Sequence, residues 1–155
     1  MITFFLKNPL LPFSALKVFV LKIFGAKIGS GVLIKQSISV KYPWKLTIGN
    51  NVWVGEDVWI DNLDEVVVGD NVCLSQGAML LCGNHDYKKS TFDLIIGKIT
   101  LEDGVWIGAK SVVCGGVTCC SHSILSVSSI VSKKMEPYKI YRGNPAVEVS
   151  KRVIY

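Results

Sequence analysis

The sequence of 155 residues predicts an all-β fold, a parallel β-solenoid of about five coils, from three observations. Aliphatic residues recur every six positions, small or apolar residues often stand two positions before them, and Gly, Ser or Asp frequently follows them. The alternation indicates short strands, and the small residues suit sharp corners between strands. Three strands and three corners would complete one triangular coil. The recurring positions are Ile28, Ile34, Val40, Ile48, Val54, Ile60, Val68, Leu74, Leu80, Leu101, Ile107, Val113, Cys119, Leu125 and Val131.

Successive coils are expected to stack through backbone hydrogen bonds about 4.8 Å apart, so that equivalent aliphatic residues form ladders inside the solenoid. Each buried rung would contribute at most about 1.5 to 3 kcal/mol. An antiparallel sandwich is disfavoured, because it would show turn signals about every 8 to 12 residues without a fixed phase along the chain. A single β-helical domain is therefore expected over residues 28–135.

The N-terminal segment, residues 1–27, is apolar and basic, and it should form a short helix with Ser14 as its N-cap and Gly25 at its end. Lysines and prolines interrupt it too often for a membrane span, and it lacks a signal-peptide cleavage site. We expect it to pack against its own protein or a neighbouring subunit. Contact of residues 1–24 with a membrane surface is the alternative.

The six-residue spacing changes at three places. Over residues 40–48 and 60–68 the step is eight residues, which predicts a two-residue bulge at the same corner of two coils. Over residues 80–101 the step is 21 residues, so that about 15 residues should leave the prism as a loop within 82–100. This loop contains His85, one of the two histidines in the chain. Loops on rigid scaffolds often carry binding and catalytic groups.

Charge and cysteine content limit the functional classes. Residues 1–27 contain four lysines and no acid, and residues 133–152 contain six basic and two acidic residues, whereas the region between has seven basic and ten acidic residues. Basic ends suit a phosphate-bearing ligand or an anionic membrane surface. Nucleic-acid binding is disfavoured, because no recognition motif accompanies these charges. The five cysteines form no C-x-x-C pair, which favours a reducing cytoplasm. The last residues, 136–155, should close the solenoid as a tail or short helix.

These motifs together carry a resemblance to a known family. The sequence resembles the left-handed β-helix acyltransferases of the hexapeptide-repeat family, and most closely the colanic acid biosynthesis acetyltransferases. The resemblance implies the handedness of the coil, a homotrimer, and acetyl-CoA bound in the groove between neighbouring prisms as acetyl donor. The acceptor would be a sugar hydroxyl in surface-polysaccharide biosynthesis. The matching segments are "FGAKIG", "VGDNVCLSQGAML", "NHDY", "LEDGVWIGAKSVV" and "YRGNPA".

The resemblance also assigns roles to individual residues. His85 would be the general base that deprotonates the acceptor hydroxyl during direct transfer in a ternary complex. The acceptor-binding candidates are Asp61, Asn62 and Asp86, with Asp86 as a candidate to orient the histidine. The cofactor-binding candidates are Ser75, Ala109, Val127, Ser132, Lys133 and Arg142. No metal is expected.

Structural roles remain open for several of these residues. Asn62 could cap the bulge, the basic candidates could be exposed surface charges, and His122 is expected to be structural. The chain departs from the family pattern in two places. Relatives usually carry a basic residue where this chain has Val147, and the segment "GGVTCCSHSILSVSS" lacks the expected Gly-rich turns. Both differences could lower the affinity for CoA.

Three other functions remain as alternatives. A zinc hydratase with the same fold is disfavoured, because it needs three histidine ligands and the chain has two histidines. A non-catalytic scaffold subunit would not need His85. Acetyl transfer to an amine, an antibiotic or another non-sugar acceptor uses the same chemistry.

Overall fold

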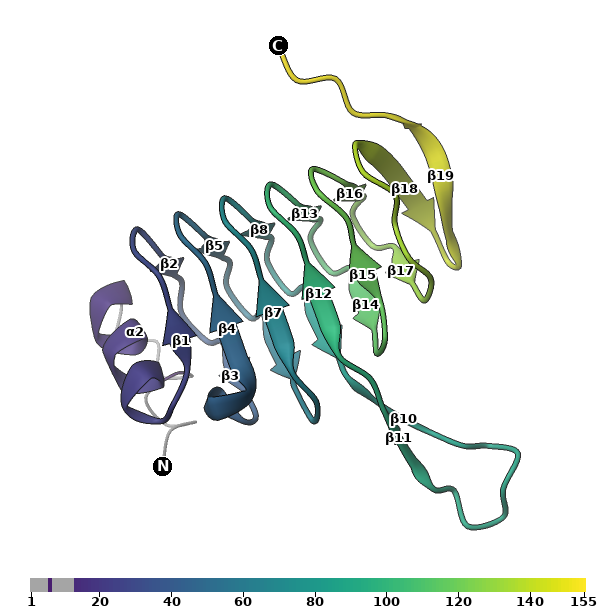
Figure 1. The fold of residues 1–155 in the computed structure, drawn as a ribbon, viewed down its shortest axis with the longest axis horizontal. Helices are drawn as coiled ribbons and strands as arrows, with labels where there is room; N and C mark the ends of the chain where they lie inside the picture. Colours follow the sequence, from purple (N-terminus) through teal and green to yellow (C-terminus); the bar gives the residue numbers. More distant parts are fainter. Residues whose placement is uncertain (1–5, 7–12) are drawn as a thin grey trace.

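The computed structural model describes Leu6 and residues 13–155, and its strands wind into a parallel β-solenoid with three walls (Figure 1). Two of the walls are sheets of five strands, and the remaining wall, called the second wall below, is a sheet of seven strands that includes the C-terminal pair. Each coil supplies one strand to each wall. Five complete coils are present, as the spacing predicts, and the C-terminal strands begin a sixth.

The strands are short, as expected for a coil that turns every six residues. The first wall contains β1 (Lys27–Ile28), β4 (Leu46–Ile48), β7 (Val66–Val68), β12 (Ile99–Leu101) and β15 (Thr118–Cys119). The second wall contains β2 (Leu33–Ile34), β5 (Trp53–Val54), β8 (Cys73–Leu74), β13 (Trp106–Ile107), β16 (Ile124–Leu125), β18 (Lys139–Gly143) and β19 (Ala146–Lys151). The third wall contains β3 (Ser39–Val40), β6 (Trp59–Asp61), β9 (Met79–Leu81), β14 (Val112–Cys114) and β17 (Ile130–Val131).

The core consists of the predicted ladders. In the second wall, for example, Val54, Leu74 and Ile107 are backbone partners in successive coils, and each is at most 1% exposed. Residues on either side of these positions point outward, because strand side chains alternate. All fifteen recurring positions of the sequence are buried.

Cys119 replaces an aliphatic residue in one ladder and is completely buried. Burial, with a smaller contribution from the neighbouring thiol of Cys120, raises the pKa of Cys119 to about 12. The thiol therefore stays protonated at neutral pH and packs as a small apolar group. All five cysteines are free.

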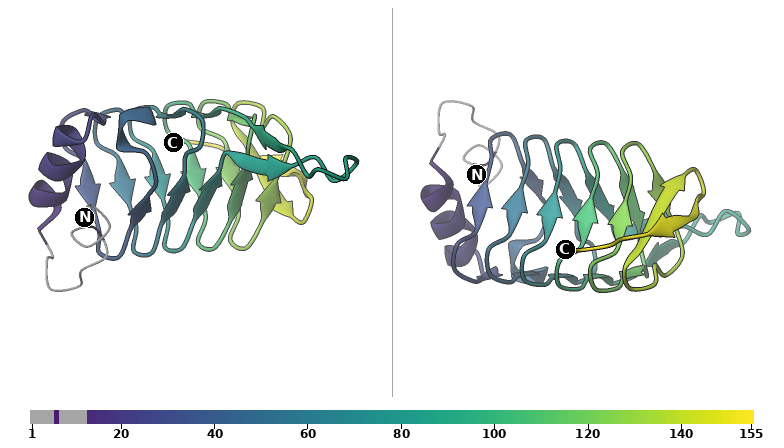
Figure 2. Two further views of the ribbon diagram at one scale, coloured as in Figure 1. Left: turned by 90° about the horizontal axis from the view of Figure 1, so that it is seen from below. Right: turned by 90° about the horizontal axis from the view of Figure 1, so that it is seen from above.

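The corner between the third and first walls carries the three predicted changes of spacing. The first bulge is filled by the short 3₁₀ helix η1 (Pro43–Lys45), and the second by residues 62–65. At the same corner the chain leaves the prism between β9 and β12. The predicted loop is a β-hairpin of β10 (Gly83–His85) and β11 (Leu94–Ile96), which projects away from the walls (Figures 1 and 2). The excursion ends before Ile99, because Ile99 and Thr100 already pair with β7.

The C-terminal segment forms strands where a tail or short helix was predicted. Strand β18 pairs in parallel with β16, which places Tyr141 above Leu125 and continues the ladder. The chain then turns after Gly143, and β19 returns antiparallel to β18. The open edge of the last coil offers unpaired backbone groups, and pairing with β18 satisfies them; β19 in turn covers β18.

Helix α2 (Ser14–Ile23) covers the opposite end of the prism (Figure 1). The helix was predicted, but Ser14 is not its N-cap. The N-cap is Phe13, without a side-chain capping bond, and the hydroxyl of Ser14 accepts a hydrogen bond from the Ile34 backbone at 2.8 Å. Residues 1–5 and 7–12 of the predicted N-terminal segment lie outside the described residues. No helix in the described part of the chain has the length and apolar composition needed to cross a bilayer.

Candidate functional site

His85 lies on the projecting hairpin, at the end of β10, where it is paired with Leu94 of β11. Its side chain is exposed to solvent. The hairpin is anchored at its base by Gly97, whose backbone N–H donates to the carbonyl oxygen of Cys82 at 2.9 Å. A two-stranded ladder thus holds the histidine at a fixed place outside the prism.

One nitrogen of the His85 ring is engaged by the opposite side of the hairpin. Nδ1 lies 2.7 Å from the carbonyl oxygen of Phe92. A carbonyl oxygen only accepts hydrogen bonds, so Nδ1 must carry the proton in this contact. In a neutral imidazole, Nε2 then has the free lone pair. The hairpin therefore fixes the tautomer that can accept a proton at Nε2.

Asp86 does not contact the His85 ring, so its expected orienting role passes to the Phe92 carbonyl. The carboxylate of Asp86 accepts a hydrogen bond from the backbone N–H of Lys88 at 3.1 Å, and its carbonyl accepts one from Lys89 at 3.1 Å. Asp86 thus stabilises the turn at the tip of the hairpin. Short polar side chains commonly bond to the backbone two residues ahead in this way.

Asn62 is completely buried, and its side-chain amide forms hydrogen bonds with the neighbouring coil. Its Oδ1 accepts from the backbone N–H of Tyr42 at 2.9 Å, and its Nδ2 donates to the Tyr42 carbonyl at 2.6 Å. The Asn62 side chain therefore stabilises the bulged corner, which is the structural role that the sequence left open for it. Asp61 is partly exposed and forms an ion pair with Lys41 at 3.0 Å.

Four of the six predicted cofactor residues line one groove of about 510 Å³. The groove runs along the corner between the second and third walls, across three coils and onto β18. Its predicted members are Ser75, Ala109, Val127 and Arg142. Residues from distant parts of the sequence meet here because the coils place equivalent positions above one another.

Trp106 is the main residue of this groove that the sequence-based assignment missed. Its indole Nε1 donates to the Ser75 hydroxyl at 2.9 Å, and its side chain is 45% exposed. The available signal was its place in "VWIG", where a large aromatic residue occupies an outward strand position. A half-exposed indole gives the groove a flat apolar surface with a polar edge.

The remaining cofactor candidates lie apart from this groove. Ser132 lines a second cavity of about 630 Å³ at the base of the hairpin, together with Asn84, Cys82, Cys114 and Gly116. Lys133 is exposed and lines neither cavity. The structure therefore places four of the six candidates in the groove, one in the second cavity and one in neither.

Arg142 and Val147 are cross-strand partners in the C-terminal hairpin. Both side chains are exposed. Arg142 is therefore a cation at the edge of the groove, beside the position where a basic residue was expected and valine is found. Arg152 is not free to replace that residue, because its Nη1 donates to the carbonyl oxygens of Gly104 at 2.8 Å and His122 at 3.2 Å.

The thiols near both cavities are not activated nucleophiles. Burial raises the pKa of Cys82 and Cys114 at the hairpin base. Burial also raises the pKa of Cys73, and a hydrogen bond with Ser75 opposes this effect only in part. Reactive cysteines have a lowered pKa, so these thiols are poor candidates for a covalent intermediate.

His122 lies at a different corner from His85, between β15 and β16, and its ring stacks on Tyr138 with centroids 4.8 Å apart. This contact fits the structural role predicted for it. Within the described residues, no three His, Cys, Asp or Glu side chains are grouped so that they could hold a metal ion.

Comparison with known proteins adds the following. No family model matches the sequence. The chain is 36% identical over 137 residues to "Putative colanic acid biosynthesis acetyltransferase WcaF" of Escherichia coli (strain K12), which covers 88% of this chain and 75% of that protein. The acetyltransferase VCA0836 from Vibrio cholerae O1 biovar eltor, complexed with acetyl-CoA, matches with a TM-score of 0.85 and 21% identity over 92% of this chain and 79% of that one. A galactoside acetyltransferase in complex with coenzyme A matches with a TM-score of 0.81 and 24% identity, over 87% and 69%.

The solved structures share the fold, and the E. coli protein shares more than a third of the aligned residues over most of both chains. The six-residue repeat and the coil with three walls agree with this relationship. The chain therefore belongs to the hexapeptide-repeat acetyltransferases with the left-handed β-helix fold.

Proposed function

We propose that this acetyltransferase transfers the acetyl group of acetyl-CoA to a hydroxyl group of a saccharide in surface-polysaccharide biosynthesis. The family membership supports the reaction class, and the name of the E. coli relative supports the acceptor class. The observation that carries the mechanism is the 2.7 Å contact between His85 Nδ1 and the Phe92 carbonyl. The use of acetyl-CoA supports a reaction in the cytoplasm.

His85 acts as the general base in this proposal. As the acceptor oxygen attacks the thioester carbonyl carbon, Nε2 takes the hydroxyl proton, and the carbon–sulfur bond breaks when the tetrahedral intermediate collapses. The imidazolium then returns the proton to the leaving thiolate of CoA. The contact with Phe92 positions the ring and, in the neutral imidazole, leaves the lone pair on Nε2.

Direct transfer is favoured over an acyl-enzyme intermediate. The thiols nearest the two cavities have raised pKa values, so none offers a thiolate at neutral pH. The acceptor and acetyl-CoA would therefore be bound together, with His85 beside the hydroxyl.

We propose a homotrimer, because the donor groove and His85 lie at different corners of the prism in a single chain. The groove with Ser75 and Arg142 lies at one corner of the prism, whereas His85 projects from another. A neighbouring subunit can bring its hairpin to this groove. Exposed outward tryptophans on the second and third walls, Trp53, Trp106 and Trp59, are 42%, 45% and 43% exposed and suit a subunit interface.

In the groove, Arg142 would bind a phosphate of CoA and Trp106 would contact its apolar part, beside Ser75, Ala109 and Val127. Ser132 and Lys133 would extend the donor site toward the hairpin base. Asp61 remains a candidate for acceptor contacts through its partly exposed carboxylate. Asp86 would contribute only by shaping the hairpin tip.

Release of CoA thiol tests the proposed reaction. We expect the purified protein to release thiol from acetyl-CoA faster with a saccharide from a panel than with buffer alone. Product analysis should show an acetyl ester, which mild base removes. Faster turnover with amines and an alkali-stable amide product would instead identify an amine acceptor. Failure to bind acetyl-CoA in calorimetry would favour a non-catalytic scaffold.

Replacing Arg142 by glutamine tests the donor site. We expect the KM for acetyl-CoA to rise about tenfold or more with little change in kcat, because a phosphate contact lies away from the reacting carbonyl. Lys22→Gln removes the same charge from the opposite end of the prism and should leave the KM unchanged. An equal KM for Arg142→Gln and the parent protein would remove Arg142 from the donor site.

A further inference from the structure

Helix α2 packs on the first coil through the buried Leu21 and through two polar residues, Ser14 and Lys17. Besides Ser14, which bonds to Ile34, the side chain of Lys17 donates from Nζ to the carbonyl oxygen of Lys35 at 3.0 Å. Lys17 is only 1% exposed, and burial lowers its pKa. Both hydrogen bonds are made with backbone groups on the outer edge of the first coil, the edge that has no neighbouring coil. A sheet edge needs such partners, which explains why polar residues of the helix face the protein.

The opposite side of α2 is apolar and exposed. Leu16, Phe19 and Ile23 are spaced three and four residues apart, so they share one side of the helix, and they are 38%, 60% and 64% exposed. Phe13 before the helix and Phe24 after it are also exposed. We call these five residues the end patch. Surface helices usually bury most of their apolar residues, whereas α2 buries Leu21 and leaves Leu16, Phe19 and Ile23 exposed.

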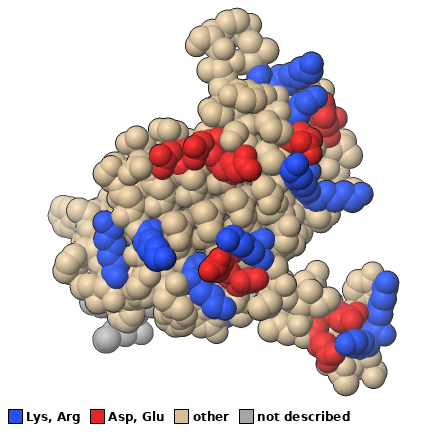
Figure 3. Space-filling view, in the orientation of Figure 1, with Lys and Arg blue, Asp and Glu red and all other residues tan. Residues whose placement is uncertain are grey.

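Basic charge surrounds the end patch. Lys22 and Lys27 are exposed beside it. The first acidic residue of the chain is Glu56, and seven lysines precede it. Figure 3 shows basic but no acidic side chains over the α2 end of the molecule. The end of the prism therefore combines an apolar surface with a positive rim.

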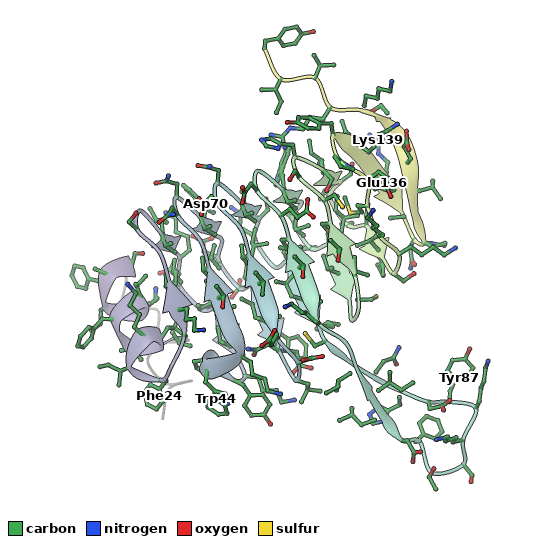
Figure 4. All side chains as sticks on the ribbon, viewed as in Figure 1. Phe24, Trp44, Asp70, Tyr87, Glu136 and Lys139 are labelled. Carbon is green, nitrogen blue, oxygen red and sulfur yellow. The ribbon has the colours of Figure 1, made fainter. Side chains whose placement is uncertain are left out.

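A further aromatic residue extends the apolar surface beyond α2. Trp44 of η1 is 61% exposed, and its Cβ lies beside Gly25, directly after Phe24. Figure 4 shows Trp44 and Phe24 near each other at the same end of the molecule. An amphipathic indole at the margin of such a surface suits the boundary between lipid and water.

We propose that the end patch docks on the surface of a membrane that contains anionic lipid, with Phe19 and Ile23 inserted among the acyl chains and Lys22 and Lys27 at the headgroups. Aromatic and aliphatic side chains with lysines at the margin are typical of helices that lie in a membrane interface. A second copy of this chain is a poorer occupant, because two equal ends with lysines and no acid repel each other. This inference goes beyond the acetyl transfer proposed above and gives the enzyme access to acceptors at a membrane.

Vesicle co-sedimentation of the full chain tests the inference. The protein should bind vesicles of phosphatidylcholine mixed with phosphatidylglycerol, and it should bind pure phosphatidylcholine vesicles more weakly. The double variant Phe19→Ser/Ile23→Ser should lower the partition coefficient about tenfold or more. Lys22→Gln/Lys27→Gln should weaken binding to the anionic vesicles only. Raising the salt to about 1 M, where the Debye length is about 3 Å, should have a similar effect.

Matched controls come from other parts of the molecule. Tyr155→Ser removes a fully exposed aromatic residue at the C-terminal end, and Lys88→Gln/Lys151→Gln removes two charges far from α2. Both should bind as the parent does. Equal binding of the Phe19→Ser/Ile23→Ser variant and the parent would overturn the proposal. So would a change in the oligomeric mass of that variant in light scattering, because the patch would then be a contact between subunits. Thiol release with a soluble acceptor should stay at the parental rate.

Discussion

Replacing His85 by alanine is expected to lower kcat for acetyl transfer about 10²- to 10⁴-fold, with little change in the KM for acetyl-CoA. In the proposed mechanism the ring supplies the atom that takes the hydroxyl proton, whereas the groove that we assign to the donor lies at another corner. The loss should therefore appear in the chemical step. Steady-state thiol release with a saturating saccharide measures both constants.

Two further variants separate catalysis from structure. His85→Gln keeps a side-chain N–H that can donate to the Phe92 carbonyl but offers no basic nitrogen, so it should be as slow as His85→Ala. Tyr87→Ala changes an exposed residue, 76% accessible, in the same hairpin and should retain most of the activity. Full turnover by a folded His85→Ala protein would exclude the proposed mechanism.

The same variants test whether two subunits share one site. If the hairpin of one subunit acts on the groove of its neighbour, mixed oligomers of His85→Ala and Arg142→Gln chains contain some sites with both native residues. Refolding the two variants together should then restore part of the activity at low acetyl-CoA concentration. Restoration that is no greater than the average of the separate variants would place both residues in the site of a single chain.

Replacing Leu74 by alanine is expected to lower the free energy of unfolding by about 2 to 5 kcal/mol. Leu74 is completely buried in the middle of a ladder, between Val54 and Ile107. Backbone hydrogen bonds fix the coils above and below at their spacing, so the walls cannot collapse into the space left by the side chain. Urea unfolding followed by circular dichroism measures the difference.

Leu33→Ala is the matched control for this prediction. Leu33 belongs to the same wall but points outward and is 37% exposed, so its truncation should cost less than about 1 kcal/mol. If Leu74→Ala and Leu33→Ala were equally stable, the buried ladders would not be the main source of stability.

The sequence by itself determined the coil and the residues inside it. The six-residue spacing and the alternation of side chains are local properties, and each coil repeats them, so the register of Val54, Leu74 and Ile107 followed directly. The position of the hairpin followed from the one long interruption of that spacing. The choice of His85 and of four residues in the groove came from family resemblance, and the periodic stacking explains why Ser75, Ala109 and Val127 lie together.

Only the tertiary structure decided which partners the polar groups have. Asn62 serves the backbone of Tyr42, and the carbonyl of Phe92, which no side-chain pattern reveals, holds His85. The open edges of the first and last coils explain both the inward-facing Lys17 and the C-terminal strand pair. Such pairings join residues from different coils, from the helix and a coil, or from the two sides of a hairpin. Their geometry exists only after the coils have stacked, so local sequence could not specify them.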